Sequence, residues 1–409
     1  MPPDRGPNAS TGTIRRRMSR PTDQRRAAVV VIDACGAGAL PDAAAYGDPP
    51  DANTIAHVAE AVGGLHVPTL ERLGLGSIMP IDGVSPARDP VIHGRLHPLG
   101  PGKDSTTGHW ELMGVVADKA PPTYPAGFPP EIVAALEDAT SLRFCGNRPA
   151  DGIAIIEELG EHHLRTGEVI LYTSADSVLQ LAAHDDVLPE AELHAACEAA
   201  RGVMHGEHAV GRVIARPFTG EPGHFTRTGG RRDYSLEPPR PSYLVELQAA
   251  GVPVHGVGKI RDLFAGVGID RKHAATTNEE GLAVTTELLH ELRRGLIFTN
   301  LVETDQLHGH RHDVRGFADA LGQIDRAVAE WLDDCLGPGD MLVLTADHGV
   351  DPTAPHSDHT REYAPLLAVG AGRRGRRHDG PLADVGASVL HWLAGRRSDD
   401  LPGESFVGG

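Results

Sequence analysis

The chain has 409 residues, of which 40% are hydrophobic but only 4% aromatic, and its formal net charge is −18. This length favours two domains over one, and the negative charge argues against binding to the phosphate backbone of nucleic acids. No apolar run approaches the ~18 residues of a membrane-spanning helix, so we expect no association with a membrane.

The N-terminal segment, residues 1–27, differs from the rest of the chain. It holds seven arginines against Asp4 and Asp23, and it is rich in Pro, Ser and Thr. It lacks the apolar core of a secretory signal. We expect a disordered arm. A targeting or nucleic-acid-binding arm, and a true start at Met18, are the alternatives.

Short apolar, β-branched runs predict buried strands along the remaining chain. The first run, residues 27–32, ends at Asp33 and opens into a Gly-Ala-Gly loop. Further runs cover residues 169–173, 210–215, 252–257, 296–302, 341–345 and 366–369. Apolar residues at steps of three and four from Val314 to Cys335 predict a helix. Strands that alternate with helices indicate an α/β fold with a mostly parallel sheet.

The side chains that could take part in catalysis or bind a metal cluster near the two ends of the chain, within residues 33–114 and 300–363. The middle of the chain has strands and helices of its own. We therefore predict a catalytic core, flanked by helices, from residues 28–118 and 241–409. An inserted α/β cap domain, residues 119–240, would interrupt this core.

The four cysteines are scattered along the chain and include no Cys-x-x-Cys pair. They are Cys35, Cys145, Cys197 and Cys335. This usage favours a reducing, cytoplasmic setting, and it argues against a disulfide framework or a metal cage built from thiolates.

Carboxylate and imidazole side chains follow the ends of three predicted strands. They are Asp33 after the first strand, Asp305 and His310 after the strand at 296–302, and Asp347, His348 and His359 after the strand at 341–345. Ligands of α/β sheets gather beyond the carboxyl ends of the strands, so we expect these side chains to meet. Three Asp and three His suit Mn or Zn better than Ca, and two ions better than one.

Two pairs of these residues, Asp347 with His348 and Asp305 with His310, need a special local geometry to share a metal. Adjacent residues of an extended strand point to opposite faces. Asp347 and His348 can therefore share a metal only if the chain turns there, which the following Gly349 allows. Asp305 and His310 are five residues apart, a poor helical spacing, so we expect them on a loop.

Residues 102–111, Gly-Lys-Asp-Ser-Thr-Thr-Gly-His-Trp-Glu, place three consecutive hydroxyl residues between Asp104 and Gly108. A hydroxyl is a weak nucleophile, and coordination to a metal is one way to activate it. The same residues could instead cap a helix. Both roles are compatible, because a helix N-terminus also favours a bound phosphate.

Together these segments resemble the phosphopentomutases, a family of the alkaline phosphatase superfamily. The matching stretches are residues 31–38, 41–42, 102–111, 172–179, 211–218, 225–228, 258–260, 299–313 and 345–366. The similarity runs from about residue 28 to near the C-terminus, and it includes segments of the mutase-type cap as well as the metal ligands.

The resemblance implies an alkaline-phosphatase-like core with two Mn²⁺ ions and a cap that closes over a sugar phosphate. One metal would be held by Asp33, Asp347 and His348 and shared with the nucleophile. The other would be held by Asp305, His310 and His359.

The reaction implied is the interconversion of ribose or 2-deoxyribose 1-phosphate and 5-phosphate in nucleoside and pentose phosphate metabolism. It passes through a phosphorylated enzyme hydroxyl and a sugar bisphosphate, with a bisphosphate primer as activator.

Two positions depart from the family pattern. The family nucleophile is a threonine directly after the Asp of its motif, and here this position is Ser105, which we expect to be catalytic. Thr106 is out of register with the motif. The loop after Asp33 usually reads Ser-Val-Gly-Ile-Gly but is Ala-Cys-Gly-Ala-Gly here, which would bring Cys35 near the metals.

The candidates for binding substrate lie mainly in cap segments that match the family. They are Ser174, Asp176, Arg212, Arg216, Arg227 and, near the return to the core, Lys259. The planar fork of Arg suits phosphate oxygens, and the carboxylate of Asp176 could accept hydrogen bonds from sugar hydroxyls.

We expect a small pentose phosphate as the substrate of a monomeric enzyme. A metal-dependent phosphatase of the same superfamily is the alternative, and a metal-binding protein without catalysis is a third interpretation. The mutase-like cap segments favour the mutase.

Overall fold

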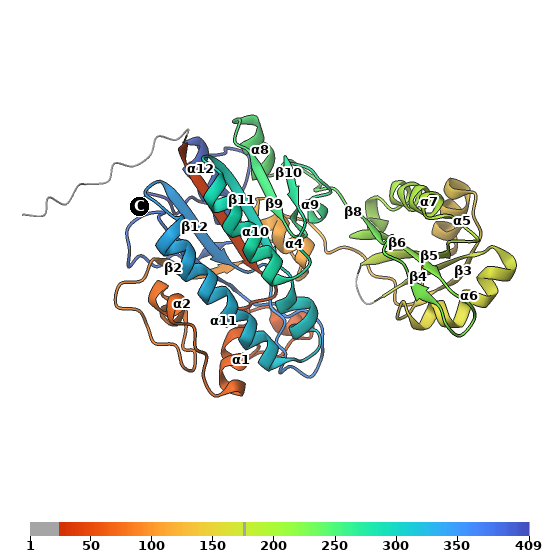
Figure 1. The fold of residues 1–409 in the computed structure, drawn as a ribbon, viewed down its shortest axis with the longest axis horizontal. Coiled ribbons are helices and arrows are strands. Elements are labelled where there is room, and N and C mark those ends of the chain that lie inside the picture. Colours follow the sequence, from red (N-terminus) through yellow and green to blue (C-terminus); the bar gives the residue numbers. More distant parts are fainter. Residues whose placement is uncertain (1–23, 175–176, 409) are drawn as a thin grey trace, which may run out of the picture.

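The computed structural model describes residues 24–174 and 177–408, and two β-sheets divide these residues into two lobes (Figure 1). Strands β3 to β8 form a six-stranded sheet, and the other strands form an eight-stranded sheet. We call residues 124–235, which surround the six-stranded sheet, the smaller lobe, and the part around the eight-stranded sheet the larger lobe. Asp176 and residues 1–23 lie outside the described residues.

The eight-stranded sheet contains strands from both ends of the chain. In spatial order its strands are β10 (Arg271–His273), β9 (Val254–Val257), β11 (Gly295–Leu301), β1 (Arg26–Ile32), β12 (Asp340–Thr345), β13 (Ala364–Val369), β2 (Ile92–His97) and β14 (Gly380–Pro381). Strand β13 is antiparallel to both its neighbours, and the remaining pairings are parallel. The prediction of an α/β fold with a mostly parallel core sheet is confirmed.

Helices of the larger lobe form two contacting groups. One contains α1 (Thr54–Val62), α2 (Pro68–Leu73), α10 (Asn278–Glu291) and α11 (Val314–Glu330); the other contains α4 (Ser105–Leu112), α8 (Tyr243–Ala249), α9 (Ile260–Leu263) and α12 (Asp384–Ala394). The short helix α3 (Leu75–Ile78) contacts β2 and β13. Since α10 and α12 both contact β11, the two groups cover the two faces of the sheet.

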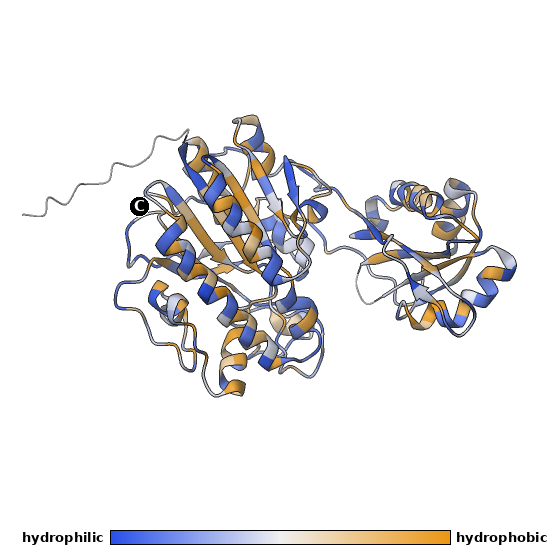
Figure 2. Ribbon diagram, viewed as in Figure 1, coloured by the Kyte–Doolittle hydropathy of each residue, from blue (hydrophilic) through white to orange (hydrophobic). Residues whose placement is uncertain are grey.

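The central strands β1, β11 and β12 are buried along their whole length. They stand out as apolar in the middle of the larger lobe (Figure 2). Strands of a parallel sheet that are covered on both faces read as continuous apolar runs, and that is why the sequence predicts them well.

Strand β1 begins at Arg26, two residues before the predicted start of the core at residue 28. The guanidinium of Arg26 is buried, and its Nε donates to Asp340 Oδ1 at 2.9 Å. Its Nη2 donates to the carbonyl of Cys335 at 3.0 Å. An apolar pattern cannot show this extension, because it depends on a charged side chain whose partner is distant in the sequence.

The smaller lobe is a second α/β unit. Its sheet contains β3 (Phe144–Pro149), β4 (Val169–Thr173), β5 (Val178–His184), β6 (Arg212–Thr219) and β7 (Thr226–Arg227), with β8 (Arg232–Ser235) also paired to β6. Helices α5 (Pro130–Thr140) and α7 (Glu190–Val203) contact each other, and α7 covers one face of the sheet, while α6 (Ala154–Thr166) contacts β3, β4 and β5. Alternate residues of β4 therefore enter two separate apolar clusters, Leu171 in one and Ile170 in the other.

Candidate metal centre and nucleophile

The carboxyl ends of β1, β11 and β12 meet at one edge of the larger sheet. Ile32 pairs with Leu301 of β11, and Val31 pairs with Thr345 of β12. This register brings Asp33, Asp305 and Asp347, which follow the three strand ends, to the same place. The expected convergence of the three segments is therefore observed in the geometry.

Asp33, Asp347 and His348 form the first group of facing donor atoms. His348 Nε2 lies 3.4 Å from Asp33 Oδ1 and 3.4 Å from Asp347 Oδ2, and all three side chains are buried. The chain does turn after β12, as Gly349 allows: Gly349 pairs with Thr360 in an isolated bridge.

Two residues that the sequence analysis did not single out fix these carboxylates. Asn300 Nδ2 donates to Asp33 Oδ2 at 2.9 Å, and the amide of Ala34 donates to Asp347 Oδ1 at 3.2 Å. Asn300 lies in the matching stretch 299–313, but only its contact with Asp33 shows its role.

Asp305 and His310 lie on a π-helix, Thr304–Gly309, with His310 as its C-terminal cap, so the prediction of a loop was wrong. The amide of His310 donates to the carbonyl of Asp305 at 3.0 Å. A hydrogen bond from residue i+5 to residue i is the defining contact of a π-helix. It makes a spacing of five residues favourable, and His310 Nε2 lies 3.3 Å from Asp305 Oδ1.

All three imidazoles turn Nε2 toward the carboxylates. Each Nδ1 faces a backbone carbonyl: His348 that of Gly349 at 3.1 Å, His359 that of Lys103 at 2.9 Å, and His310 that of Ser357 at 2.6 Å. A carbonyl can only accept, so each Nδ1 carries the proton and each Nε2 can offer a lone pair. This outer-shell arrangement is usual for histidines that bind metals.

The donor atoms fit divalent cations. Within the described residues, two groups of three side chains at this centre have ligand atoms that lie within 4.8 Å of one another. The first group is Asp33, Asp347 and His348, and the second is Asp305, His348 and His359. Asp305 Oδ1 and Asp347 Oδ2 are buried and accept no well-formed hydrogen bond. Carboxylate oxygens and imidazole lone pairs that face one another this closely repel unless positive charge lies between them.

The pKa values of Asp33 and His348 are shifted by the opposite charges that face each other in this cluster. Burial would raise the pKa of Asp33, but the hydrogen bond and charge of His348 and the charge of Lys259 hold it well below its usual range. Burial would lower the pKa of His348, but the nearby carboxylates of Asp347 and Asp33 raise it well above its usual value. The site thus attracts cations, whether protons or metal ions.

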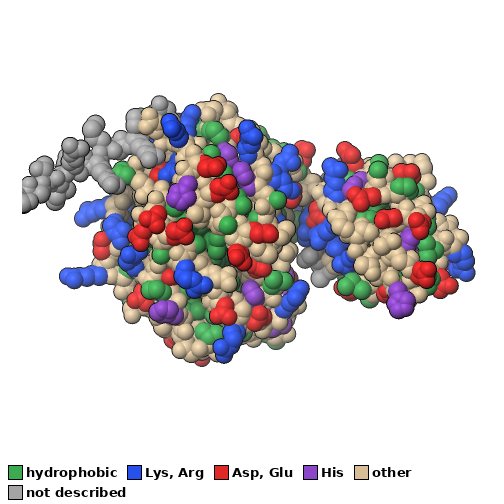
Figure 3. Space-filling view, in the orientation of Figure 1, with side chains coloured by type: hydrophobic (Ala, Val, Ile, Leu, Met, Phe, Trp, Pro, Cys, Tyr) green, Lys and Arg blue, Asp and Glu red, His purple; other side chains and the backbone are tan. Residues whose placement is uncertain are grey.

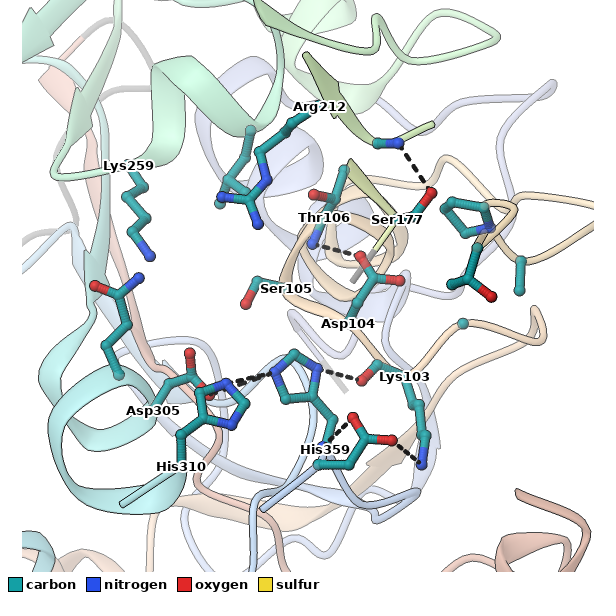
Figure 4. Close-up of a pocket in the computed structure, with 18 of the residues that line it drawn as sticks. Lys103, Asp104, Ser105, Thr106, Ser177, Arg212, Lys259, Asp305, His310 and His359 are labelled. Carbon is teal, nitrogen blue, oxygen red and sulfur yellow. Dashed lines mark hydrogen bonds and ion pairs between the residues drawn. The ribbon is translucent and has the colours of Figure 1, made fainter. Parts of the chain in front are cut away.

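Ser105 lies at the edge of this cluster, at the first residue of α4. Its Oγ is 3.1 Å from His348 Nε2 and 3.3 Å from Asp33 Oδ1. Asp104 caps the helix by accepting hydrogen bonds from the amides of Thr106 and Thr107. Because Asp104 performs the capping, the hydroxyl of Ser105 points to the candidate metal ligands instead (Figure 4).

His109 is a buried residue of the same helix for which the sequence suggested no role. Its Nδ1 lies 2.8 Å from the carbonyl of Ser105 and 3.0 Å from Asp347 Oδ2. Burial would lower the pKa of His109, but the charge of Asp347, whose Oδ2 faces this ring, raises it. His109 therefore links the backbone of Ser105 to a candidate metal ligand.

The loop before Ser105 is tied to the loop that carries His359. Lys103 Nζ pairs with Asp48 at 2.9 Å and with Asp358 at 3.3 Å, while Arg361 Nη1 donates to the carbonyl of Gly102 at 2.7 Å. These contacts join two segments that are about 250 residues apart in sequence.

Cys35 is buried beside this centre, as the resemblance implied. Burial and the charges of Glu362 and Asp347 raise the pKa of its thiol far above the ordinary value. A thiol held in its protonated form is a weak nucleophile.

A cavity of about 600 Å³ opens above Ser105 between the two lobes. The larger lobe contributes Lys103, Ser105, Asp305, His310 and His359, and the cap side contributes Ser177 and Arg212 (Figure 4). Lys259 and Arg311 also line it. In Figure 3, Lys and Arg side chains gather where the smaller lobe faces the larger one.

The predicted substrate residues fall into two places. Arg212 and Lys259 line the cavity, whereas Ser174, Arg216 and Arg227 are not among its described lining residues. Arg216 Nε donates to Gln180 at 3.1 Å, and the charges of Arg216, Arg227 and Arg231 act on the buried hydroxyl of Tyr172. Ser177, the residue directly after the predicted Asp176, lines the cavity without having been singled out.

Comparison with known proteins identifies the family of this chain. Residues 25–395 match the family model of the metalloenzyme superfamily. The phosphopentomutase of Carboxydothermus hydrogenoformans is 50% identical over 347 residues, which cover 85% of this chain and 89% of that protein. That of Anaeromyxobacter sp. (strain K) is 50% identical over 94% of this chain and 98% of that protein. The chain belongs to the phosphopentomutase family.

Membership of the phosphopentomutase family and of the metalloenzyme superfamily makes the chain a metal-dependent enzyme with a candidate binuclear centre. It also agrees with the alkaline-phosphatase-like fold that the resemblance implied. Among the described residues, no helix combines the length and the apolar character needed to cross a membrane.

Proposed function

We propose that this enzyme interconverts pentose 1-phosphates and pentose 5-phosphates, of ribose or 2-deoxyribose, through phosphorylated Ser105 and a pentose bisphosphate. The observation that carries the proposal is the position of the Ser105 hydroxyl. It is 3.1 Å from His348 and 3.3 Å from Asp33, and it lines a cavity that both lobes share. A volume of about 600 Å³ lies within the ~300–1,000 Å³ typical of small-molecule sites.

Asp33, Asp347 and His348 would hold one Mn²⁺ ion, and Asp305, His310 and His359 the other. When bound, the two ions supply positive charge to the attacking and leaving oxygens of an in-line phosphoryl transfer. The proximity of His348 to both ligand groups supports a pair of ions that are close together.

In the first half of the reaction, the Ser105 phosphoryl group passes to the free hydroxyl of the bound pentose phosphate. The bond from phosphorus to Ser105 Oγ breaks, a bond to the sugar oxygen forms, and the sugar hydroxyl gives up its proton as Ser105 regains one. The product is the bisphosphate. After it reorients, its other phosphoryl group returns to Ser105 and the isomeric monophosphate leaves.

Residues 119–240 would act as the cap that retains the bisphosphate during this reorientation. Arg212 lines the cavity from the cap side, across from Asp305, His310 and His359, so it suits the phosphate that is not reacting (Figure 4). Lys259 also lines the cavity and is close enough to Asp33 and Asp305 for their charges to act on it. Burial lowers the pKa of Lys259, while Asp33 and Asp305 act to raise it. Ser174, Asp176, Arg216 and Arg227 remain candidates for the sugar and its phosphates.

We also propose that the enzyme acts as a monomer in the cytoplasm. All four cysteines are free, which suits a reducing compartment. Light scattering of the purified protein would test the monomer, because a mass near twice 43.3 kDa would contradict it.

The test of the function is to incubate the enzyme with ribose 1-phosphate, Mn²⁺ and ribose 1,5-bisphosphate as primer. We expect ribose 5-phosphate to form and a phosphoryl group to appear on the peptide of residues 102–111, measured by mass spectrometry. Free phosphate as the only product would overturn the proposal in favour of a metal-dependent phosphatase.

A further inference from the structure

A second group of metal-binding side chains lies in the smaller lobe. Cys145, His162 and Glu168 offer a thiol, an imidazole and a carboxylate whose ligand atoms lie within 4.8 Å of one another. His162 Nε2 is 2.7 Å from Glu168 Oε2, and Cys145 Sγ is 3.7 Å from the carbonyl of Glu168. None of the three lines the cavity above Ser105.

The fold of the smaller lobe brings the three residues together. Cys145 is on β3 and His162 is near the end of α6, which packs against β3 and β4. Gly167 ends α6 with a φ of 78°, a conformation that favours glycine. This turn places Glu168 directly before β4, which pairs with β3, and the Cys145 thiol reaches back to the carbonyl of Glu168.

The group is accessible to solvent and distant from the catalytic centre. All three residues are partly exposed, with the side chains of His162 and Glu168 36% and 38% exposed. Strand β3 and helix α6 lie on the side of the smaller lobe that faces away from the larger one (Figure 1). A metal ion can therefore reach the three residues without passing the substrate cavity.

We propose that Cys145, His162 and Glu168 bind one Zn²⁺ ion, with water at the fourth position. A thiolate, an imidazole and a carboxylate form a donor set that Zn²⁺ accepts readily, and three protein ligands with one open position are a common zinc arrangement. The proposed catalytic ligands are only Asp and His, which suit Mn²⁺. The thiolate therefore makes the ligands of this site softer than those of the catalytic centre.

Zinc binding rearranges protons at this site. The Cys145 thiol gives up its proton, because the thiolate is the ligand. His162 Nε2 exchanges its contact with Glu168 for the metal, and the proton of the ring moves to Nδ1. Arg165 Nη2, 3.5 Å from Nδ1, then turns away. The bound ion joins β3, α6 and the start of β4, so it stabilises the smaller lobe independently of the phosphoryl transfer.

Cobalt substitution tests the site, because a thiolate bound to Co²⁺ gives an intense charge-transfer band in the near ultraviolet and Asp or His ligands do not. The full-length enzyme is first saturated with Mn²⁺ and then titrated with Co²⁺. Because Co²⁺ can also replace Mn²⁺ at the Asp and His ligands, the readout is the band itself, whose final intensity should correspond to one thiolate-bound Co²⁺ per chain and which should disappear when Zn²⁺ is added. Absence of the band in the wild-type protein would overturn the proposal.

Variants identify the ligands. Cys145→Ser should abolish the band, and His162→Gln should weaken Co²⁺ binding by more than the ~10–100-fold that outer-shell partners contribute. Cys335→Ser is the matched control, because Cys335 Sγ also lies beside an imidazole, 3.5 Å from His290 Nε2. A band that survives in Cys145→Ser, or that is lost in Cys335→Ser, would assign the ion elsewhere.

A measurement on the wild-type protein keeps the test independent of folding defects. Zn²⁺ should slow alkylation of Cys145 by iodoacetamide at least ~10-fold, as mapped by mass spectrometry, and leave the rate at Cys335 unchanged. Equal rates at Cys145 with and without Zn²⁺ would contradict the site.

Discussion

His109 Nδ1 lies 3.0 Å from Asp347 Oδ2, and both side chains are completely buried. His109 also contacts the carbonyl of Ser105 at 2.8 Å. One imidazole thus contacts both a candidate metal ligand and the backbone of the candidate nucleophile, which lies four residues earlier on the same helix.

Replacing His109 should weaken metal binding. In His109→Asn the shorter side chain leaves Asp347 without this neighbour, and we expect Mn²⁺ affinity to fall about 10–100-fold, as for other outer-shell partners. Isothermal titration calorimetry measures this affinity. His66→Asn, at an exposed position, is the control and should bind Mn²⁺ normally. Unchanged affinity in His109→Asn would show that Asp347 is held without this contact.

Ser105→Ala should abolish the phosphoenzyme while leaving the metal content near normal, because the hydroxyl is lost and all candidate ligands remain. We expect kcat to fall by at least ~10³-fold, a usual result of removing a covalent nucleophile. Labelling by the bisphosphate primer, read by mass spectrometry, is the measurement. Ser105→Thr, which has the residue usual in the family, should keep the label. Retained labelling of Ser105→Ala would move the nucleophile to Thr106.

Arg212→Ala should raise KM for pentose phosphates about 10–100-fold, since loss of a hydrogen bond to a charged group typically costs about 1.5–3 kcal/mol. Steady-state kinetics with ribose 1-phosphate would measure the change. The control is Arg143→Ala, because Arg143 is an exposed arginine of the same lobe that pairs with Glu137. Equal KM values for the two variants would show that Arg212 does not bind the substrate.

Breaking the buried ion pair between Arg26 and Asp340 should destabilise the larger lobe. Arg26→Met removes the positive charge that the buried Asp340 carboxylate faces, and we expect the free energy of unfolding to fall by about 3–5 kcal/mol. Denaturant unfolding followed by Trp fluorescence measures it. The double variant Arg26→Met, Asp340→Asn should lose less, because a neutral amide can still accept from the amide of Gly337. An equal loss in both variants would mean that packing, and not charge, explains the effect.

Acid should loosen the edge of the larger sheet at His255 and His273. Burial lowers the pKa of both imidazoles, and the charge of His273 lowers that of His255 further; the rings stack with His255 Nδ1 3.0 Å from His273 Nε2. The unfolded chain, with an ordinary pKa of ~6.5, binds more protons than the folded chain below that pH. Stability from this pair is therefore complete above pH ~6.5 and lost as the pH falls.

Hydrogen exchange of residues 254–273, corrected for the intrinsic pH dependence, would measure this loosening. We expect opening to increase by at most about tenfold per pH unit for each imidazole. His273→Gln keeps a hydrogen-bonding side chain without the titratable ring and should reduce the dependence. Exchange that does not change between pH ~7 and ~5 would contradict the prediction.

The sequence predicts the buried centre of this fold better than its edges. The apolar runs that become β1, β4, β11 and β12 are continuous because both faces are covered. Strands β3 and β10 contain charged or half-exposed residues, and β14 has only two residues, so no apolar pattern marks them.

The candidate site shows a similar limit. The predicted metal ligands lie just after the ends of β1, β11 and β12, as expected, because both the residue types and the strand positions can be read from the sequence. The π-helix at Asp305, the contact of Asn300 with Asp33 and the burial of His109 depend on neighbours that are far apart in the chain, and no local pattern contains them.

The parallel register of β1, β11 and β12 also affects synthesis of the protein. Asp33 and Ser105 leave the ribosome long before Asp347 and His359, so no nascent chain can complete the metal centre until nearly the whole polypeptide has emerged. Residues 124–235 are continuous in sequence and can pack their sheet earlier. Metal uptake at the proposed centre would therefore be a late event, and a truncated chain should be unable to retain the ions.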